Sequence, residues 1–279
     1  MSDLDQSVEH YAVFGNPIAH SKSPRLQQAF AQQTHQAMEY SAVCIPLDDF
    51  AVSVHNFFND GGKGLNITVP FKQQAFELAQ VLTPRAQLAG AVNTLFLDKD
   101  QRLAGDNTDG VGLITDLIDR LNWPITHKRL LILGAGGAVR GILQPIIEEN
   151  PSMIVIANRT VEKARELVKI FSEKFSIQAV TYRDIPRYRF DLVLNGTSAS
   201  LAGDLPPVPD KVIGEHSRCY DMVYGKQRTP FLQWASDCGA RCLSDGLGML
   251  VAQGAESFTI WRRRRPDIEP VIEMIRETL

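Results

Sequence analysis

Short apolar runs alternate with longer amphipathic segments through the first part of the chain. Runs rich in β-branched and aromatic residues predict strands at residues 11–14, 40–45 and 65–69. Between them, N-terminal helix signals and the spacing of apolar positions predict helices at 24–34 and 50–59. Strands and helices in this order are typical of an α/β domain with a mainly parallel sheet.

The following segment departs from simple alternation. A helix is predicted from residue 72 to about 80, and a second, shorter helix is expected to begin near Pro84. A strand at 91–97 is followed by a polar turn, so we expect a hairpin that returns to residues 102–104.

Regular alternation resumes after a helix over 111–121, which Asn122-Trp123-Pro124 ends. Strands are predicted at 129–133, 153–157, 177–181, 191–195 and 219–223, and we expect the last of these to be the final strand of this part. Helices are predicted after the glycine turn to about residue 149, at 161–172 and at 229–238. The pattern therefore predicts two α/β domains, residues 1–110 and residues 111–245.

The tail from residue 246 contains helical patterns and no predicted strand. One helix continues through Trp261 into the run Arg262-Arg263-Arg264-Arg265, and Pro266 ends it before a last helix over 269–278. A basic run at a helix C-terminus is explained by the helix macrodipole, so no function is attached to it. We expect residues 246–279 to pack back on the first domain.

Composition narrows the classes of function. The 279 residues carry a net charge of -3, which gives no reason to expect nucleic acid or a membrane surface as a partner. No apolar run has the length of a membrane span, so we expect a cytoplasmic protein, as a monomer or a homodimer. Of the four cysteines, Cys44 and Cys219 are expected in the core, while Cys238 and Cys242 lack the partners of a metal site.

A glycine-rich turn follows the buried strand 129–133. Gly134 and Gly136 form half of a dinucleotide fingerprint, in which one glycine permits a tight turn and the other lets the backbone approach a pyrophosphate. Val139 stands where a glycine or alanine is usual, so the strict pattern is not met. The strand, helix and next strand around this turn still favour nucleotide binding.

The end of the following strand indicates which dinucleotide binds. An NAD site has an acidic residue about 20 residues after the glycines, which binds the ribose hydroxyls. This chain has Asn158-Arg159-Thr160 there, with Lys163 one turn later. An arginine can bind a 2′-phosphate through charge-assisted hydrogen bonds, so the sequence favours NADP over NAD. A surface arginine beside a helix-capping threonine is the alternative.

Polar residues also end strands in the first domain. The run Gly64-Leu65-Asn66-Ile67-Thr68-Val69-Pro70-Phe71-Lys72 ends a strand and turns at a proline into a helix. Asp109 follows another strand, so Lys72 and Asp109 can face one cleft. Reduction of a ketone needs a proton as well as a hydride, and a lysine held by a carboxylate can supply it. The simpler alternative is a solvated lysine in an ordinary turn.

The chain as a whole resembles the shikimate dehydrogenase family. The resemblance covers nearly all of the chain and rests on several motifs in the same order. These are Ser21-Lys22-Ser23-Pro24, residues 66–72, Ala91-Val92-Asn93-Thr94, residues 105–110, residues 134–140, Asn158-Arg159-Thr160, residues 220–224 and residues 246–253.

The resemblance implies reversible, NADPH-dependent reduction of 3-dehydroshikimate to shikimate by a substrate domain and a Rossmann-like NADP domain. It implies Lys72 as proton donor and acceptor, assisted by Asp109. Substrate contacts are implied for Ser21, Ser23, Thr68, Asn93, Asp109, Tyr224 and Gln253. Cofactor contacts are implied for Gly134, Ala135, Gly136, Gly137, Ala138, Asn158, Arg159, Thr160, Lys163, Met222 and Gly246, and no metal is implied.

Two other interpretations remain. A quinate/shikimate dehydrogenase of broader specificity needs the same hydroxyl contacts. A binding or regulatory protein with this fold and no catalysis is a different class, against which the presence of both Lys72 and Asp109 argues.

Overall fold

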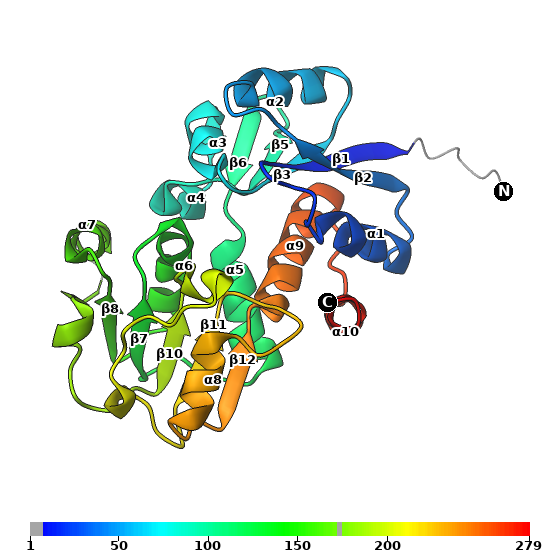
Figure 1. Cartoon of the computed structure of the whole chain (residues 1–279). Coiled ribbons are helices and arrows are strands. Elements are labelled where there is room, and N and C mark those ends of the chain that lie inside the picture. The colour runs from blue at the N-terminus through cyan, green and yellow to red at the C-terminus, as the bar shows by residue number, and fades with distance from the viewer. Residues whose placement is uncertain (1–7, 172–174) are drawn as a thin grey trace. The chain divides into compact units, whose positions relative to one another are not determined.

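The structure, a computed structural model, describes residues 8–171 and 175–279. It contains two compact units, each with its own six-stranded sheet (Figure 1). The first unit comprises described residues up to Asp109 together with residues 251–278, and the second comprises described residues of 110–250.

The sheet of the first unit has the strand order β2-β1-β3-β5-β6-β4. Its strands are β1 (Glu9–Gly15), β2 (Met38–Cys44), β3 (Gly64–Ile67), β4 (Val81–Leu82), β5 (Thr94–Leu97) and β6 (Leu103–Asp106). β1 is parallel to β2 and β3, because the helices α1 (Ser23–Gln33) and α2 (Phe50–Asn59) provide the crossovers. β5 is antiparallel to β3 and β6, which confirms the predicted hairpin in a mainly parallel sheet.

Short helices connect the later strands of this unit. α3 (Lys72–Leu78) follows β3, and α4 (Pro84–Ala89) precedes β5. The core beneath them includes the stacked rings of Phe50 and Phe71, whose centroids are 4.8 Å apart. This apolar layer fixes the start of α3 and therefore the position of Lys72.

The sheet of the second unit is wholly parallel, with the strand order β12-β11-β10-β7-β8-β9 typical of a Rossmann-like domain. Its strands are β7 (Arg129–Leu133), β8 (Met153–Ala157), β9 (Ile177–Val180), β10 (Leu192–Asn195), β11 (Arg218–Asp221) and β12 (Cys242–Asp245). Its helices include α5 (Asp109–Ile114, beginning at the boundary with the first unit), α6 (Gly137–Glu148), α7 (Val161–Phe171) and α8 (Pro230–Asp237), with 3-10 turns at Tyr182–Asp184, Ala199–Ala202 and Asp210–Val212. Residues 130–133 of β7 and 192–194 of β10, the two central strands, are apolar and buried, as expected for a sheet covered on both faces.

The C-terminal helices pack on the first unit. α9 (Leu247–Arg262) lies beside α1, where the side-chain amide of Gln27 donates to the carbonyl of Gly254 over 3.0 Å (Figure 1). A Cβ atom at Gly64 would lie 2.5 Å from Nε1 of Trp261, so β3 and α9 approach too closely for any side chain there. α10 (Glu269–Arg276) packs against α1. Arg262 forms an ion pair with Glu9 and donates to Gln36.

Several predicted elements differ from the structure. β3 ends at Ile67, because Thr68 and Phe71 close a turn through a 3.0 Å backbone hydrogen bond, and α3 starts at Lys72. The predicted helix over 111–121 changes at residue 115 into a π-helical segment (Thr115–Arg120). β12 was not predicted, since its sequence Cys-Leu-Ser-Asp lacks a continuous apolar run.

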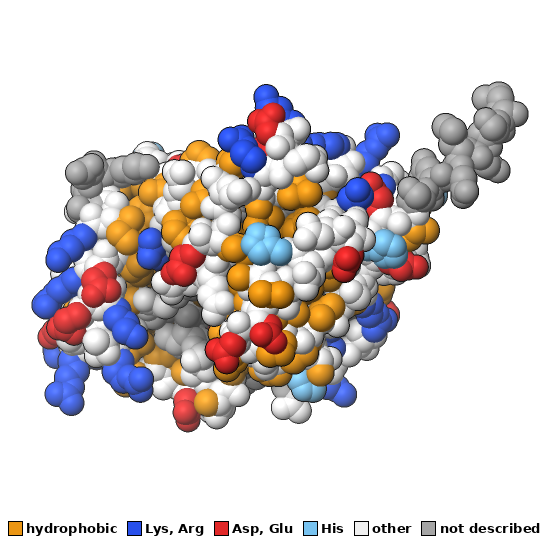
Figure 2. Space-filling view, turned by 90° about the horizontal axis from the view of Figure 1, so that it is seen from above, with side chains coloured by type: hydrophobic (Ala, Val, Ile, Leu, Met, Phe, Trp, Pro, Cys, Tyr) orange, Lys and Arg blue, Asp and Glu red, His pale blue; other side chains and the backbone are white. Residues whose placement is uncertain are grey.

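The two cysteines expected in the core differ in burial. Cys219 is buried as expected, but Cys44 is exposed at the end of the edge strand β2, where apolar neighbours do not imply burial. On the face seen in Figure 2, acidic and basic side chains are interspersed, with no continuous field of one sign.

Candidate functional site

Lys72 and Asp109 form an ion pair in the first unit. Lys72 is the first residue of α3 and Asp109 the first residue of α5, and Nζ lies 2.6 Å from Oδ2. The Lys72 side chain is 31% exposed and that of Asp109 is 12% exposed, so solvent reaches the ammonium more readily than the carboxylate. The two residues that the sequence proposed as a catalytic pair are therefore in direct contact.

Asn93 connects this pair to α9. Its Nδ2 lies 2.9 Å from Oδ1 of Asp109, 2.9 Å from Oγ1 of Thr108 and 3.2 Å from Oε1 of Gln253. Its Oδ1 accepts the backbone N–H of Thr108 over 3.0 Å. Four predicted site residues thus meet within the first unit, although they are up to 181 positions apart in the sequence, counted from Lys72 to Gln253.

Ser21, Ser23 and Thr68 lie at neighbouring strand ends of the same unit. Ser21 is in the turn after β1, and its Oγ accepts the N–H of Ser23 over 3.3 Å. Helix α1 begins at Ser23 itself, with Lys22 at the cap position, although a serine before a proline is typical of an N-cap. Thr68 follows β3, and its Cγ2 lies 2.5 Å from where a Cβ of Gly15 would be. Gly15 therefore leaves room for Thr68 at this edge.

Asn66 lies beneath this surface as a buried structural residue. Its Oδ1 accepts the hydroxyl of Tyr40 over 2.7 Å, and its Nδ2 lies 3.0 Å from Oγ of Ser257 and 3.1 Å from the carbonyl oxygen of Asn93. Burial raises the pKa of Tyr40 well above its ordinary value, so the phenol stays protonated and donates. Asn66 thus fixes β3 against β5 and α9.

Sequence reasoning missed the polar residues that support this arrangement. Thr94, Thr108 and Ser257 are buried, and their hydroxyls are mutually hydrogen-bonded around Asn66 and Asn93. The available signal was spacing: Ser257 follows Gln253 by four residues on one helix and shares its face.

A cavity of about 730 Å³ opens in the second unit above the glycine turn. It is lined by Gly134, Ala135, Gly136, Gly137, Ala138, Asn158, Arg159, Thr160, Lys163, Tyr182, Gly196, Thr197, Ser198, Ala199, Ala202, Asp204, Leu205, Pro206 and Pro207. All the predicted cofactor residues between 134 and 163 are in this lining. The loop after β10, which is rich in Ser, Thr and Gly, also lines the cavity, and none of its residues was predicted as a cofactor contact.

The glycine turn fits a pyrophosphate. Gly134 has φ +101°, which side chains disfavour, and a Cβ there would lie 3.1 Å from the carbonyl oxygen of Gly196. A Cβ at Gly136 or Gly137 would meet nothing within 4 Å, so both backbones face open space at the start of α6. Free N–H groups at a helix N-terminus are suited to a phosphate anion.

The far end of the cavity is cationic. Arg159 and Lys163 line it, and Asn158 donates to the carbonyl oxygen of Thr160 over 2.7 Å, which shapes the turn into α7. Arg159 lies close enough to Tyr182 for its charge to favour the phenolate, although burial dominates and raises the pKa of Tyr182. The residues present therefore fit a dinucleotide that carries an extra phosphate.

Three further predicted residues lie in the second unit outside that lining. A Cβ at Gly246 would lie 2.2 Å from the carbonyl oxygen of Met222, and the Sδ of Met222 lies 3.2 Å from the Cβ position of Gly196. Gly246 is therefore required for the close approach of these two segments. Tyr224 is half-buried, and burial together with the charge of Asp245 raises its pKa.

The described residues contain neither a cluster of metal ligands nor a helix that could span a membrane. Within 8–171 and 175–279, no three His, Cys, Asp or Glu side chains are grouped as ligands for a metal ion. Over the same residues, no helix combines the length and apolarity needed to cross a membrane.

Three family models match the chain. Residues 13–95 match the shikimate dehydrogenase substrate binding domain, residues 117–202 match shikimate / quinate 5-dehydrogenase, and residues 246–276 match the shikimate 5'-dehydrogenase C-terminal domain. Together they cover most of the sequence in one continuous order.

Individual proteins agree with these models. The chain is 53% identical to the shikimate dehydrogenase (NADP(+)) of Cellvibrio japonicus over 96% of this chain and 97% of that one. The Ael1 enzyme from Pseudomonas putida has a TM-score of 0.91 and 46% identity, covering 95% of this chain and 97% of that chain. Shikimate 5-dehydrogenase from Thermus thermophilus, solved with NADP(H) and shikimate, has a TM-score of 0.87 and 30% identity over 98% of this chain and all of that one. Because the chain is 53% identical to the Cellvibrio japonicus enzyme over nearly its full length, it belongs to the shikimate dehydrogenase family.

Proposed function

We propose that this chain catalyses the reversible reduction of 3-dehydroshikimate to shikimate with NADPH, using Lys72 as proton donor and acceptor. Membership of the family makes it an NADP-dependent oxidoreductase of the shikimate pathway. The observation that supports the residue assignment is the 2.6 Å contact between Nζ of Lys72 and Oδ2 of Asp109.

The chemistry divides into a hydride and a proton. When bound, NADPH supplies the hydride that converts the ketone carbon into an alcohol carbon. Lys72 gives a proton from its ammonium to the ketone oxygen in this direction and takes one from the alcohol in the reverse direction. Asp109 holds the ammonium in place, and Asn93 holds Asp109 through its other carboxylate oxygen.

Hydroxyl-rich substrates need several fixed donors and acceptors. Ser21, Ser23, Thr68, Asn93, Asp109, Tyr224 and Gln253 are proposed to bind the hydroxyl and carboxylate groups of the substrate. In this proposal residues 1–110, with the helices of 246–279, form the substrate domain and residues 111–245 the NADP domain.

Cofactor choice is assigned to the cavity of the second unit. Residues 134–138 are proposed to bind the pyrophosphate, and Arg159, Thr160 and Lys163 the 2′-phosphate. Met222 and Gly246 are proposed to contact the nicotinamide end, next to Gly196. We further propose a cytoplasmic enzyme, monomeric or homodimeric, which light scattering after gel filtration distinguishes.

One assay tests the proposed activity. Purified protein mixed with NADPH and 3-dehydroshikimate is expected to lose nicotinamide absorbance, and the reverse reaction with shikimate and NADP⁺ to restore it. Absence of both reactions in a folded protein that still binds NADP⁺ would instead support a non-catalytic binding protein.

A second candidate is a dehydrogenase that also accepts quinate, because the model that matches residues 117–202 covers shikimate and quinate enzymes alike. The reverse assay with quinate in place of shikimate distinguishes the two. A kcat/KM for quinate within about tenfold of that for shikimate would favour the broader activity, since a tenfold ratio is about 1.4 kcal/mol of discrimination.

A further inference from the structure

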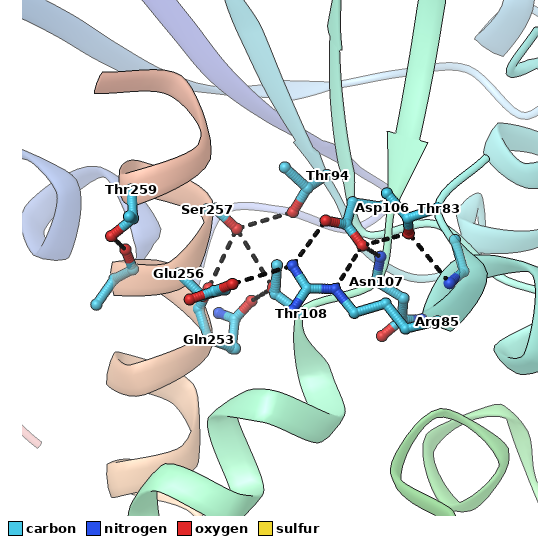
Figure 3. A network of polar contacts seen from close by, with 12 residues as sticks. Thr83, Arg85, Thr94, Asp106, Asn107, Thr108, Gln253, Glu256, Ser257 and Thr259 are labelled. Atoms are coloured by element: carbon cyan, nitrogen blue, oxygen red, sulfur yellow. Dashed lines mark hydrogen bonds and ion pairs between the residues drawn. The ribbon is translucent and has the colours of Figure 1, made fainter. Parts of the chain in front are cut away.

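Arg85, in the first turn of α4, is at the centre of a network of ion pairs in the first unit (Figure 3). Its Nε lies 2.6 Å from Oδ1 of Asp106, and its Nη2 lies 2.7 Å from Oδ2 of the same carboxylate. The same Nη2 lies 3.0 Å from Oε1 of Glu256 on α9. One guanidinium therefore joins the end of β6 to the C-terminal helix.

This network is sheltered from solvent. The side chain of Asp106 is 5% exposed, that of Glu256 17% and that of Arg85 27%. Burial works against ionisation of Asp106, but the Arg85 guanidinium, the Thr83 hydroxyl and the Asn107 N–H outweigh it and lower its pKa. Burial likewise opposes the charge of Arg85, and the two carboxylates outweigh it and raise its pKa. Both groups are therefore charged at neutral pH and paired where truncation of either is costly.

A continuous series of hydrogen bonds leads from Arg85 to Asp109. Oδ1 of Asp106 accepts the N–H of Asn107 over 2.7 Å. Oδ1 of Asn107 in turn accepts the N–H of Asp109 over 3.1 Å, while its Nδ2 donates to the carbonyl oxygen of Ala91 over 3.0 Å. Arg85 thus holds the carboxylate that orders the turn from which Asp109 reaches Lys72.

The other arm of the network holds α9. Gln253, Glu256 and Ser257 share one face of this helix, because residues three and four apart are neighbours. Thr108 Oγ1 lies 3.3 Å from Oε1 of Gln253 and 3.3 Å from Oγ of Ser257 (Figure 3). Glu256 lies between Gln253 and Ser257 in the sequence, so its ion pair with Arg85 fixes the rotation of α9 about its axis. Glu256 also accepts from Arg265 over 3.2 Å, which gives one arginine of the basic run a structural partner.

We propose that Arg85 is a positioning residue, which places Asp109 through Asp106 and Gln253 through Glu256 while touching neither Lys72 nor substrate. The proposal rests on the proposed function, because the placement of Asp109 and Gln253 affects turnover only if they serve the reaction.

A second arginine–aspartate pair, in the turn between β5 and β6, serves as a contrast. Nη2 and Nε of Arg102 lie 2.8 Å and 3.0 Å from Oδ2 of Asp98, but the Arg102 side chain is 53% exposed. Exposed ion pairs of this kind contribute little to stability.

Two matched variants, Arg85→Gln and Arg102→Gln, test the proposal by steady-state kinetics. Arg85→Gln is expected to lower kcat for shikimate oxidation by about 10- to 100-fold, the cost of a displacement of about 1 Å in a catalytic group. Its Kd for NADP⁺ should stay within about twofold, because the cofactor cavity lies in the other unit. Arg102→Gln should match the wild type. Arg85→Lys keeps the charge without the planar fork and should recover only part of the rate.

Hydrogen exchange supplies a readout that does not depend on the reaction. The amides of Asn107 and Asp109 should exchange faster in Arg85→Gln than in the wild type, and at wild-type rates in Arg102→Gln. Wild-type kcat and exchange in a folded Arg85→Gln protein would overturn the proposal, as would equal losses of shikimate turnover and NADP⁺ affinity. If the wild type oxidises neither shikimate nor quinate, the proposed function fails, and the exchange data alone decide whether Arg85 orders the turn.

Glu256→Gln tests the link between Arg85 and α9 separately, and it replaces Arg85→Gln if that variant does not fold. It keeps the Arg85–Asp106 fork and weakens the pairs that Glu256 forms with Arg85 and with Arg265, whose side chain is 54% exposed. The KM for shikimate should rise several-fold with kcat less affected, since Gln253 is proposed to bind substrate. An unchanged KM would overturn the α9 part of the proposal.

Discussion

The candidate site of the first unit and the cavity of the second are built in different ways. Around Lys72 and Asp109, side chains from α3, α5, α9 and the residue before β5 hold one another through buried or partly buried hydrogen bonds. Around residues 134–138 the backbone itself forms the surface, and glycines leave it bare. The first arrangement depends on contacts between distant residues, whereas the glycine surface of the second is contained in one strand–turn–helix.

This difference suits the chemistry proposed for each unit. A proton donor must stay within hydrogen-bond reach of one oxygen atom, so its supports need several anchors. A pyrophosphate is bound by a row of backbone N–H groups that the fold supplies wherever a helix begins. Changes in the first unit should therefore alter rate, and changes in the second should alter cofactor affinity.

Lys72→Ala is expected to have the largest effect on turnover and no effect on cofactor binding. Loss of the proton donor should reduce kcat by about 10²–10⁴-fold, with substrate KM changed much less. NADP⁺ affinity, measured by calorimetry, should remain that of the wild type. Near-normal turnover would remove Lys72 from the mechanism.

Asn66→Ala tests whether the first unit depends on its buried supports. The change leaves the Tyr40 hydroxyl and the Ser257 hydroxyl without their amide partner, which should lower the free energy of unfolding by about 2–3 kcal/mol. Urea denaturation measures this value. Asn158→Ala is the comparison in the second unit, where one exposed local hydrogen bond is lost and stability should change by less than about 0.5 kcal/mol.

Arg159→Ala tests the second unit in turn. NADPH should bind about 10- to 100-fold more weakly while NADH affinity is nearly unchanged, because only NADPH carries the 2′-phosphate. Arg165→Ala is the matched control, since Arg165 lies on α7, the helix that follows Arg159, with its side chain 64% exposed and paired to Glu162. Equal weakening of both cofactors would show that Arg159 does not recognise the phosphate.

The smallest expected effect concerns pH and the Asp106–Arg85 pair. The pKa of Asp106 is lowered in the folded protein, so the pair stabilises the fold above the ordinary carboxylate pKa of about 3.9. This contribution is lost as the pH falls below that value and through the lowered folded pKa. The Tm difference between wild type and Arg85→Gln should be constant from pH 7 to about 4.5 and shrink below pH 4. A constant difference down to pH 3 would contradict the assignment.

The two regions also differ in how far the sequence predicts them. The strand, glycine turn and helix around Gly134 are local patterns, and so is the Arg159 position at the end of the next strand. Residues 134–138 of the turn and Arg159 are all in the cavity lining. The loop after β10 joins this cavity only through the order of strands in the sheet, so local pattern did not assign Thr197 or Ser198 to it.

In the first unit, the sequence pairs Lys72 with Asp109 because strand ends of one sheet share an edge and because the family resemblance implies it. The partners that bury them were not predicted. Thr108 lies in a polar cluster typical of a loop, and nothing in the sequence assigned a role to Ser257 or Arg85. Their roles arise because β5, β6, α4 and α9 lie together in the folded unit, and local sequence patterns do not predict which of these elements are in contact.

The division of α9 between the two units has a consequence for synthesis of the protein. Apart from Leu279, the second unit is contiguous, and its sheet and helices are complete once residue 250 has been added. The first unit begins earlier in the chain but waits for residues 251–278, which supply Ser257 beneath Asn66 and Trp261 against Gly64. On the ribosome, the order in which the units become complete is therefore the reverse of the order in which they begin. We expect nascent chains of about 250 residues beyond the exit tunnel to protect the second unit from proteolysis before the first.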